Sequence, residues 1–253
     1  MESRSIKNWT AEQRITAVKD MFNSITPHYD LLNRVLSARR DVSWRKFVVT
    51  RIPAQAERIL DLATGTGDLA IEIARGLPQG RVTGADFVPK MMEPAQLKTQ
   101  SKGLSSRINY VAADATKLPF PSHEFDVVTI AFGLRNIPDR FAALQEMKRV
   151  VKPGGKLITL EMTFPKSLGL RGFFKWYLNH VIPTVGGIIS GNRQAYSYLP
   201  ESIQDFLTPD QLSELFKSSG FESVRAFPLT FGLTYVHEGI AAGHHNLQTV
   251  LKC

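Results

Sequence analysis

The spacing of apolar residues changes twice along this chain. In residues 10–26 apolar side chains recur every three or four positions, which predicts an amphipathic helix. Thr10 suits the N-cap of that helix, and Pro27 lies just beyond its end. A stretch of mixed polarity, Asp30–Ser37, comes next, and a second helix is predicted over Ser43–Arg51. The apolar face of the first helix carries Ile15, Val18, Met21 and Phe22.

From Glu57 onward, short apolar runs typical of buried strands alternate with helical patterns. Strands are predicted over Arg58–Ala63, Arg81–Asp86, Ile108–Ala113, Phe125–Ala131 and Lys156–Glu161. Helices are predicted between them over Asp68–Arg75, Pro89–Ser101 and Arg140–Val150, with Thr116–Glu124 mainly loop. The segment Lys152-Pro-Gly-Gly155 is typical of a turn that leads into the fifth strand. This alternation predicts a parallel sheet covered by helices on both faces.

Residues Ser167–Pro200 interrupt the alternation, because they mix aromatic residues with glycine, proline and isolated basic residues. This texture favours an inserted, partly helical cap. A helix is then predicted over Pro209–Ser219, followed by strands over Glu222–Pro228 and Phe231–Glu238. The short connection between these two strands favours an antiparallel pair at the edge of the sheet. The tail, Gly243–Cys253, has no clear partner.

Together these elements predict one α/β domain with a doubly wound sheet, mostly parallel, whose last strand is antiparallel. A length of 253 residues suits a single large domain. Its expected parts are a helical lid (1–53), a cofactor-binding core (54–161), a substrate cap (162–205), a closing helix and strand pair (206–240) and a tail (241–253).

Composition narrows the class of protein. The hydrophobic content of 43% supports a sizeable core, and no apolar run approaches the roughly 18 residues that span a bilayer. The first residues lack the apolar centre of a secretory signal. The single cysteine, Cys253, allows neither an intramolecular disulfide nor a thiolate metal cluster, so no metal site is predicted. A cytoplasmic location is expected.

The net charge of +8 is unevenly distributed. Residues 1–51 hold 10 Lys and Arg against 5 Asp and Glu, and residues 162–200 hold 4 against none, while residues 52–161 are nearly balanced. A duplex-binding protein more usually shows one dense basic stripe, so nucleic acid is not an expected partner. Two ordinary solvated basic surfaces are an alternative interpretation.

Residues suited to an adenosine-containing ligand follow the first three strands. Gly65-Thr66-Gly67 comes after the first strand, where glycines let backbone N–H groups approach a ligand at a helix start. Asp86 ends the second strand, about 20 residues on, where an acidic side chain can bind ribose hydroxyls. Asp114 and Ala115 follow the third strand and suit the edge of an adenine. In open α/β sheets, ligands bind at this carboxyl edge.

Two features favour S-adenosylmethionine over a dinucleotide. The third glycine of the dinucleotide pattern Gly-x-Gly-x-x-Gly is missing after Gly67. Asp61, before the loop, would repel a pyrophosphate but suits a cationic methionine portion. Each acid has a structural alternative, since Asp61 could cap the loop, Asp86 the next helix, and Asp114 the end of a strand. One ligand explains all three positions at once.

Several longer segments resemble the ubiquinone/menaquinone biosynthesis C-methyltransferase family. The resemblance covers about Met21 to Glu238 and is most specific in Ile130-Ala-Phe-Gly-Leu-Arg-Asn-Ile137 and Tyr196-Ser-Tyr-Leu-Pro-Glu-Ser-Ile203. It implies the class I methyltransferase fold, which is Rossmann-like. The other matching segments are Tyr29-Asp-Leu-Leu-Asn33, Leu60-Asp-Leu-Ala-Thr-Gly-Thr-Gly-Asp-Leu69, Leu118-Pro-Phe-Pro121 and Lys152-Pro-Gly-Gly155.

The resemblance also implies an activity: methyl transfer from S-adenosylmethionine to a ring carbon of a polyprenylated quinol. The acceptor would be demethylmenaquinol, towards which the general resemblance leans, or a methoxybenzoquinol precursor of ubiquinone. Cofactor contacts carried over by motif are Thr66, Asp86, Asp114 and Ala115. A homodimer is a further implication.

The chemistry independently favours methylation of carbon. Methylation at C5 of a pyrimidine needs a cysteine nucleophile, for which the terminal Cys253 is poorly suited, and the Pro-Pro-aromatic motif used on exocyclic amines is absent. A reduced quinol needs neither, because its oxygens already push electron density onto the unsubstituted ring carbon. Positioning alone can lower such a barrier by roughly 7–11 kcal/mol.

Candidate catalytic residues are Arg135 and Asn136, just after the fourth strand. An arginine stays protonated, so Arg135 is expected to stabilise a developing phenolate or to order a water that carries the proton. A structural ion pair is its alternative role.

Tyr196 and Tyr198 are candidates for the ring pocket, or else ordinary buried aromatics. Tyr29 and Asp30 are expected in a lid over the cofactor, and the histidines that could serve as bases are His28 and His180.

A membrane-resident substrate gives the charge distribution a meaning. The two basic segments would face an anionic leaflet, each nearby basic residue contributing roughly 1 kcal/mol. Phe173, Phe174, Trp176 and Tyr177 would give the cap an interfacial apolar face. Peripheral association with the inner face of the membrane is therefore expected. The alternatives are a methyltransferase of a sterol or phenol, a non-catalytic subunit of a quinone-biosynthesis complex and, more remotely, an NAD-dependent dehydrogenase.

Overall fold

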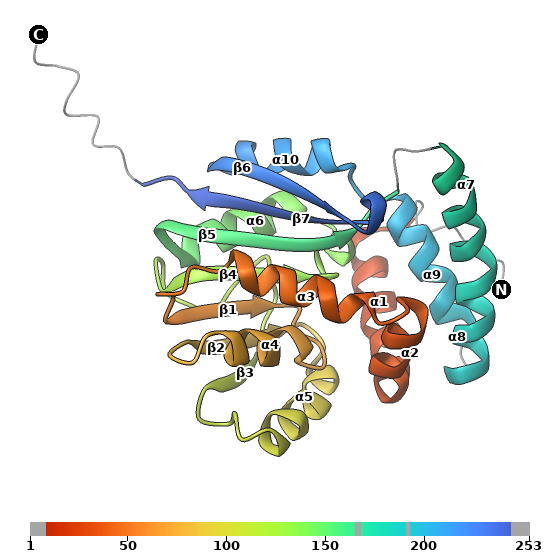
Figure 1. The fold of residues 1–253 in the computed structure, drawn as a ribbon, viewed down its shortest axis with the longest axis horizontal. Helices are drawn as coiled ribbons and strands as arrows, with labels where there is room; N and C mark the ends of the chain where they lie inside the picture. Colours follow the sequence, from red (N-terminus) through yellow and green to blue (C-terminus); the bar gives the residue numbers. More distant parts are fainter. Residues whose placement is uncertain (1–8, 165–167, 191–192, 244–253) are drawn as a thin grey trace, which may run out of the picture.

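A single seven-stranded sheet organises the computed structural model, which describes residues 9–164, 168–190 and 193–243 (Figure 1). Its strand order is β3-β2-β1-β4-β5-β7-β6, and β7 runs antiparallel to both of its neighbours. The predicted doubly wound sheet with an antiparallel last strand is confirmed. The strands are β1 (Arg58–Leu62), β2 (Arg81–Asp86), β3 (Ile108–Ala112), β4 (Phe125–Ala131), β5 (Val151–Met162), β6 (Phe221–Leu229) and β7 (Thr234–Ala241).

Side chains that alternate along the strands pack into two hydrophobic cores, one on each face of the sheet. On one face Ile59 of β1 packs with residues of α3 (Arg40–Arg51) and α4 (Asp68–Gly76). On the other face Leu60 packs with residues of α6 (Arg140–Val150) and α10 (Pro209–Ser218). Because neighbouring residues of a strand point to opposite faces, an almost continuous apolar run fills both cores at once. The remaining helix of this region, α5, spans Pro89–Ser101.

The other helices gather beyond the carboxyl ends of the parallel strands (Figure 1). The N-terminal group contains α1 (Ala11–Ile25), the short turn η2 (Thr26–His28) and α2 (Tyr29–Leu36). The cap contains α7 (Leu168–Trp176), a π-helical turn η4 (Tyr177–Val181), α8 (Ile182–Ser190) and α9 (Arg193–Gln204). Ile25 and Leu32 share a hydrophobic cluster with Phe174 and Leu178, which joins the two groups. Within the described ranges, no helix combines the length and apolarity needed to cross a membrane.

The structure corrects two local predictions and adds one helix that was not predicted. Most of Asp30–Ser37, the stretch of mixed polarity, is helical, because α2 follows η2 directly. Residues Lys152–Gly155 belong to β5, although the jump from the pair Phe125–Val151 to Val127–Lys156 shows that they bulge out of the ladder. The second strand of the edge pair begins at Thr234, because Thr230–Gly232 forms a 3-10 turn with positive φ. Most of the tail, residues 244–253, lies outside the described residues.

The predicted N-cap of the first helix, Thr10, is confirmed. The Thr10 hydroxyl accepts from the backbone N–H of Gln13, whose side chain accepts from the backbone N–H of Thr10. This reciprocal capping box satisfies two N–H groups that have no partner inside the helix. Thr208 and Gln211 repeat the arrangement at the start of α10.

Candidate functional site

A cavity of about 250 Å³ lies where four consecutive parallel strands end. Its wall is formed by the turns that follow β1, β2, β3 and β4, and by α1 on the side away from the sheet. Of the predicted cofactor residues, Gly65, Asp86, Asp114 and Ala115 line it. We call it the cofactor-side cavity. Its other lining residues include Ala11, Ile15, Val18, Phe87, Val88, Met91, Ala113, Ile137 and Asp139.

The Asp86 carboxylate joins two of these turns. One oxygen accepts from the backbone N–H of Gly65 at 2.7 Å, and the other accepts from that of Val88 at 2.8 Å. Burial raises the pKa of Asp86, and the backbone N–H groups oppose that rise because they stabilise the charged form. The same carboxylate therefore fixes the glycine loop and stands in the cavity wall, but it does not cap α5, whose N-cap Val88 has no side-chain cap hydrogen bond.

Asp61 lies beneath the loop rather than in the wall, which is formed by its neighbours Leu62 and Ala63. Its carboxylate accepts from the hydroxyls of Thr64 and Thr129, both at 2.7 Å. Burial raises the pKa of Asp61 to about 6, against the effect of these hydroxyls. A buried carboxylate of this kind places negative potential under the loop without touching the cavity.

Thr66 and Gly67 are directed elsewhere. The Thr66 hydroxyl donates to Asp30 of α2 at 2.5 Å, so it ties the loop to the N-terminal helices. Gly67 has φ +77° and is the N-cap of α4. A Cβ there would lie 2.5 Å from the hydroxyl oxygen of Tyr110, which shows a steric need for glycine at this position. Neither residue lines the cofactor-side cavity.

Asp114 and Ala115 close the far end of the cavity. One carboxylate oxygen of Asp114 accepts from both the backbone N–H and the hydroxyl of Thr116, each at 2.8 Å. This local turn fixes the Asp114 side chain at the cavity wall, which Thr116 also lines.

The groups that line this cavity fit an adenosylated amino acid. Glycine and alanine leave room for backbone approach, Asp86 and Asp114 offer acceptors at separate points, and Val88 and Met91 supply apolar surface between them. The buried charge of Asp61 suits a cationic portion at the loop end.

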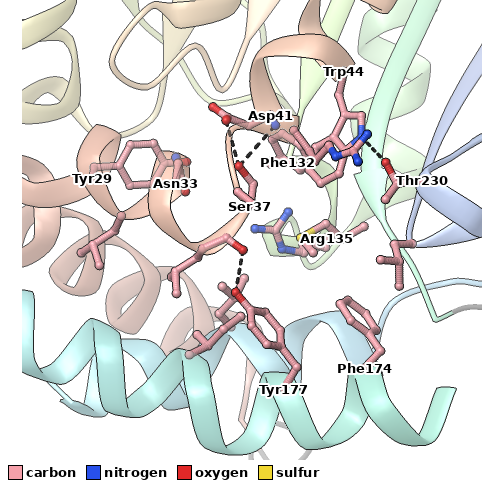
Figure 2. Close-up of a pocket in the computed structure, with 18 of the residues that line it drawn as sticks. Tyr29, Asn33, Ser37, Asp41, Trp44, Phe132, Arg135, Phe174, Tyr177 and Thr230 are labelled. Carbon is pink, nitrogen blue, oxygen red and sulfur yellow. Dashed lines mark hydrogen bonds between the residues drawn. The ribbon is translucent and has the colours of Figure 1, made fainter. Parts of the chain in front are cut away.

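A second cavity, of about 420 Å³, adjoins the first. It lies between the N-terminal helices and the cap, and most of its lining is apolar (Figure 2). Figure 2 shows the Arg135 side chain in its centre, between Ser37 on one side and Phe174 and Tyr177 on the other. We call it the acceptor-side cavity. Phe22, Tyr29, Phe132 and Asn136 line both cavities, so they form a shared wall.

Arg135 makes the structural ion pair that was its alternative role, yet it also reaches the acceptor-side cavity. Its guanidinium donates to Glu161 at 2.8 Å, and its backbone N–H donates to the same carboxylate at 3.2 Å. Arg135 is 6% exposed and Glu161 is 1% exposed. A buried partner holds the guanidinium in one orientation, so the ion pair and a role at the cavity are compatible.

Asn136 occupies the shared wall at the end of the turn η3 (Leu134–Asn136). Its amide oxygen accepts from the hydroxyl of Tyr198 at 3.0 Å, and its amide nitrogen donates to the carbonyl of Phe132 at 3.4 Å. Tyr198 lines the acceptor-side cavity, as expected for a pocket residue. The other candidate tyrosine, Tyr196, lies in α9, but its side chain is outside the described residues.

Some lining residues were not predicted for a pocket. Tyr177 and Phe174 were expected on an interfacial face of the cap, but both line the acceptor-side cavity, and Phe174 is only 5% exposed. Tyr177, on the π-helical turn, donates to the carbonyl of Leu36 at 2.6 Å and so spans from the cap to α2 (Figure 2). Trp44 donates to the hydroxyl of Thr230 at 2.8 Å across a large sequence separation. By contrast, His28 and His180 line neither cavity, and the ring of His180 bonds to the carbonyl of Trp176.

A network of charges fastens the N-terminal helices to the core. Lys98 of α5 bridges Asp30 at 2.7 Å and Asp68 at 2.6 Å. Arg34 of α2 binds Asp68 at 2.8 Å and also pairs with Asp41. With the Thr66–Asp30 bond, these contacts seat α2 on the glycine loop. The prediction that Tyr29 and Asp30 lie over the cofactor region agrees with this placement, since Tyr29 lines the cofactor-side cavity.

Comparison with known proteins gives close relatives over nearly the whole chain. The pattern of the ubiE/COQ5 methyltransferase family matches residues 8–241. The chain is 47% identical over 220 residues to a demethylmenaquinone methyltransferase of Thermus thermophilus, covering 87% of this chain and 99% of that one. It is 46% identical to the protein of the same name from Deinococcus radiodurans, covering 86% and 89%. A ubiquinone/menaquinone biosynthesis C-methyltransferase of Geotalea daltonii is 42% identical, covering 88% and 95%.

Solved structures share the fold at low identity. A SAM-dependent methyltransferase from Aquifex aeolicus has a TM-score of 0.58 and 17% identity, covering 78% of this chain and 89% of that one. The [4+2]-cyclase SpnF has a TM-score of 0.67 and 18% identity, covering 92% and 97%. Because the second of these is named a cyclase, the fold alone does not specify methyl transfer. Methyl transfer is indicated instead by the family match and by the relatives of similar sequence.

Proposed function

The chain belongs to the ubiE/COQ5 methyltransferase family and is an S-adenosylmethionine-dependent methyltransferase, and we propose that it methylates a ring carbon of a polyprenylated quinol. Demethylmenaquinol is the proposed acceptor, since two relatives named demethylmenaquinone methyltransferase are 46% and 47% identical to this chain. One observation carries the proposal. The cofactor-side and acceptor-side cavities share the wall of Phe22, Tyr29, Phe132 and Asn136, so a donor in one meets an acceptor in the other.

When bound, S-adenosylmethionine supplies an electrophilic methyl group on a sulfonium. Asp86 and Asp114 would accept from its ribose and adenine, with Ala115 at the adenine edge and Gly65 allowing close backbone approach. Asp61 would balance its positive charge from beneath the loop. Thr66 and Gly67 act indirectly, by fixing the loop to α2 and to α4.

Arg135 and Asn136 prepare the acceptor. The guanidinium of Arg135, held by Glu161, stabilises the negative charge that forms as a quinol hydroxyl gives its proton to water, which makes the ring carbon more nucleophilic. Once methylated, that carbon loses its hydrogen as a proton and the oxygen regains one, so S-adenosylhomocysteine and one net proton are released. Asn136, oriented by Tyr198, positions the ring at the shared wall. The largely apolar lining excludes water and accepts the first part of the prenyl chain. The described parts of the lid (1–53) and of the cap (162–205) would thus enclose the acceptor.

A methyl-transfer assay tests the proposal. The protein would be incubated with S-adenosylmethionine and reduced acceptors, and the products identified by mass spectrometry. We expect methylation of demethylmenaquinol, and weaker or no methylation of a tail-free naphthoquinol, a methoxybenzoquinol, a sterol or a simple phenol. Methylation of none of these, with the cofactor bound, would point to a non-catalytic subunit, while efficient turnover of a sterol or phenol would replace the quinol.

We further propose that the protein binds the inner face of the cytoplasmic membrane through α7. Phe173 and Trp176 on this helix are 64% and 52% exposed, and Arg171 and Lys175 lie beside them in sequence. Phe173 also lines the acceptor-side cavity, so the exposed apolar face reaches the entrance that a prenyl chain needs. Basic residues beside aromatic ones suit an anionic interface.

Co-sedimentation with liposomes tests this surface. We expect binding to vesicles with anionic lipid, weaker binding at high salt, and loss of most binding in a variant carrying Phe173→Ser and Trp176→Ser. Leu97→Ser is the matched control, because Leu97 is 68% exposed on α5, which lines no part of the acceptor-side cavity. Equal effects of both variants would contradict the proposal. The family resemblance also leads us to propose a homodimer, which light scattering on the protein without liposomes tests.

A further inference from the structure

Helix α1 contacts both halves of the site, through two faces. Ala11, Ile15, Val18 and Phe22 follow one another at helical spacing and line the cofactor-side cavity. Arg14, between the first two of these, faces the turn η3 and the end of α9 instead. A ligand in the cofactor-side cavity would therefore contact the same helix that carries Arg14.

The guanidinium of Arg14 connects three elements. One nitrogen donates to the backbone carbonyl of Arg135 at 3.1 Å, and another pairs with Asp205 at 3.5 Å. The Arg14 side chain is only 12% exposed. Arg140 of α6 donates to the same Arg135 carbonyl at 3.3 Å. Two cations thus converge on the peptide that links Arg135 to Asn136.

A second contact runs parallel to the first. Trp9, directly before the N-cap of α1, stacks on Tyr198 with ring centroids 6.2 Å apart and planes 15° apart. Tyr198 in turn donates to the amide of Asn136. The charge of Arg14 favours the ionised form of Tyr198, although burial dominates and raises the pKa of that hydroxyl. The start of α1 therefore reaches Arg135 through a carbonyl and Asn136 through a tyrosine.

The position of Arg14 is not explained by the stability of α1. A cation in the first turns of a helix opposes the helix dipole, and ordering a long buried side chain costs entropy. The Nε–H groups of Arg14, Arg135 and Arg140 are all buried without a hydrogen-bond partner among the described residues. Burial of unsatisfied donors is unfavourable, which argues for a role at the site rather than in the fold alone.

We propose that Arg14 is a positioning residue, which couples occupancy of the cofactor-side cavity to the placement of Arg135 and Asn136. Binding on one face of α1 sets the helix, and Arg14 transmits that position to the carbonyl of Arg135 and to Asp205. The coupling is reciprocal, so an acceptor analogue tightens the binding of S-adenosylhomocysteine and the reverse holds too. This inference rests on the proposed function for the identity of the acceptor.

The test compares Arg14→Gln, Arg14→Lys and the control Lys46→Gln, which removes a lid charge at an exposed position on α3. Titration calorimetry measures the Kd of S-adenosylhomocysteine with and without 1,4-naphthoquinone, and steady-state assays measure kcat and KM for demethylmenaquinol. For Arg14→Gln we expect a Kd without naphthoquinone within threefold of the wild type, loss of the tightening by naphthoquinone, and a tenfold or greater fall in kcat. Arg14→Lys should restore part of the coupling, and Lys46→Gln should match the wild type.

The outcomes are distinguishable. If the wild type methylates no quinol, the proposed function fails, and the tightening of S-adenosylhomocysteine by naphthoquinone is then lost as well. If the wild type is active but Arg14→Gln keeps both the tightening and kcat, the coupling role is wrong. If Arg14→Gln unfolds, the tightening of S-adenosylhomocysteine binding is measured in Asp205→Asn instead. That variant removes the charged partner of Arg14 and leaves its contact with the Arg135 carbonyl. Asp205→Asn should then halve the tightening or weaken it further, and unchanged tightening would overturn the inference.

Discussion

The two cavities of this enzyme are built in different ways. The cofactor-side cavity uses the turns after β1, β2, β3 and β4, and its polar contacts come from carboxylates and backbone groups next to glycine and alanine. The acceptor-side cavity draws large side chains from elements as distant in sequence as Met21 and Leu233. One is a property of the sheet edge, and the other is an assembly of helices over that edge (Figure 1).

The difference teaches that donor binding and acceptor activation depend on different residues, which the proposed coupling through Arg14 connects. Parallel strands fix where their turns lie, so ligand contacts in the turns depend on few other residues. Helices held by side-chain contacts place their residues only as well as those contacts allow. Substitutions in the two cavities should therefore affect different measured quantities, and substitutions in the shared wall should affect both.

The largest expected effect is on catalysis without an effect on cofactor binding. Arg135→Gln should lower kcat by roughly 10²–10³, because a developing phenolate loses its charged donor in a water-poor site. The Kd of S-adenosylhomocysteine should stay within threefold of the wild type. Steady-state kinetics and calorimetry measure the two quantities. A parallel collapse of cofactor affinity would show that Arg135 supports the cofactor-side cavity as well as the acceptor.

The converse substitution lies in the cofactor-side cavity. Asp86→Ala should weaken S-adenosylhomocysteine binding about 100-fold, since hydrogen bonds to a charged group contribute roughly 1.5–3 kcal/mol. Asp126→Ala is the matched control, because Asp126 also accepts from two backbone N–H groups, those of Glu57 and Arg58, at the opposite end of the sheet. Calorimetry should show unchanged affinity in the control. Equal losses in both variants would mean that Asp86 acts only through stability.

Two glycines of one loop sharpen the distinction between fold and ligand. Gly65 and Gly67 both have positive φ, so alanine costs roughly 1–2 kcal/mol at either. At Gly67 a Cβ also meets Tyr110 and Ala95 within 3 Å, whereas at Gly65 the nearest atom is 3.5 Å away in Met91. Gly67→Ala should lower the free energy of unfolding by roughly 1–3 kcal/mol more than Gly65→Ala.

Denaturant unfolding measures that difference, and calorimetry completes the comparison. Gly65→Ala should weaken cofactor binding more than its small loss of stability explains, because Gly65 lines the cavity and Gly67 does not. The reverse ranking in both measurements would contradict the assignment of the two roles.

The smallest expected effect is on the pH dependence of cofactor affinity. The pKa of Asp61 is raised from 3.8 to about 6, so its carboxylate gains a proton in the fold as the pH falls through 6. Its contribution to stability is full below pH 3.8 and is lost as the pH rises through 6. Affinity for the cationic cofactor should run the opposite way and fall by up to about tenfold from pH 7 to pH 5.

Asp61→Asn should flatten this dependence and stabilise the unliganded protein above pH 6. Calorimetry with S-adenosylmethionine at several pH values measures the first effect, and thermal unfolding measures the second. An unchanged slope of affinity against pH in the variant would assign the titration to another group, of which Asp86 is the first to consider because its pKa is also raised.

The sequence predicted most of the sheet and half of the site. The predicted strand Arg81–Asp86 has the same bounds in the structure, and Asp86 and Asp114 line one cavity because strand ends must meet at one edge. The sequence failed at α2, where a proline-containing 3-10 turn and a helix follow without a break. It also placed Tyr177 on an interfacial face rather than in the cavity, because a π-helical turn shifts side chains by one position relative to the helical pattern.

The sequence by itself determined which segments of the core form strands and helices, where the glycine loop lies, and which acids stand at the strand ends. These features follow from local periodicity and from the steric demands of single residues, which need no distant partner. Only the tertiary structure decided that Thr66 binds Asp30, that Arg135 is held by Glu161, and that Arg14 reaches the turn between the two cavities. Those contacts join residues 26 to 121 positions apart, and only the packing of helices over the sheet edge brings them together.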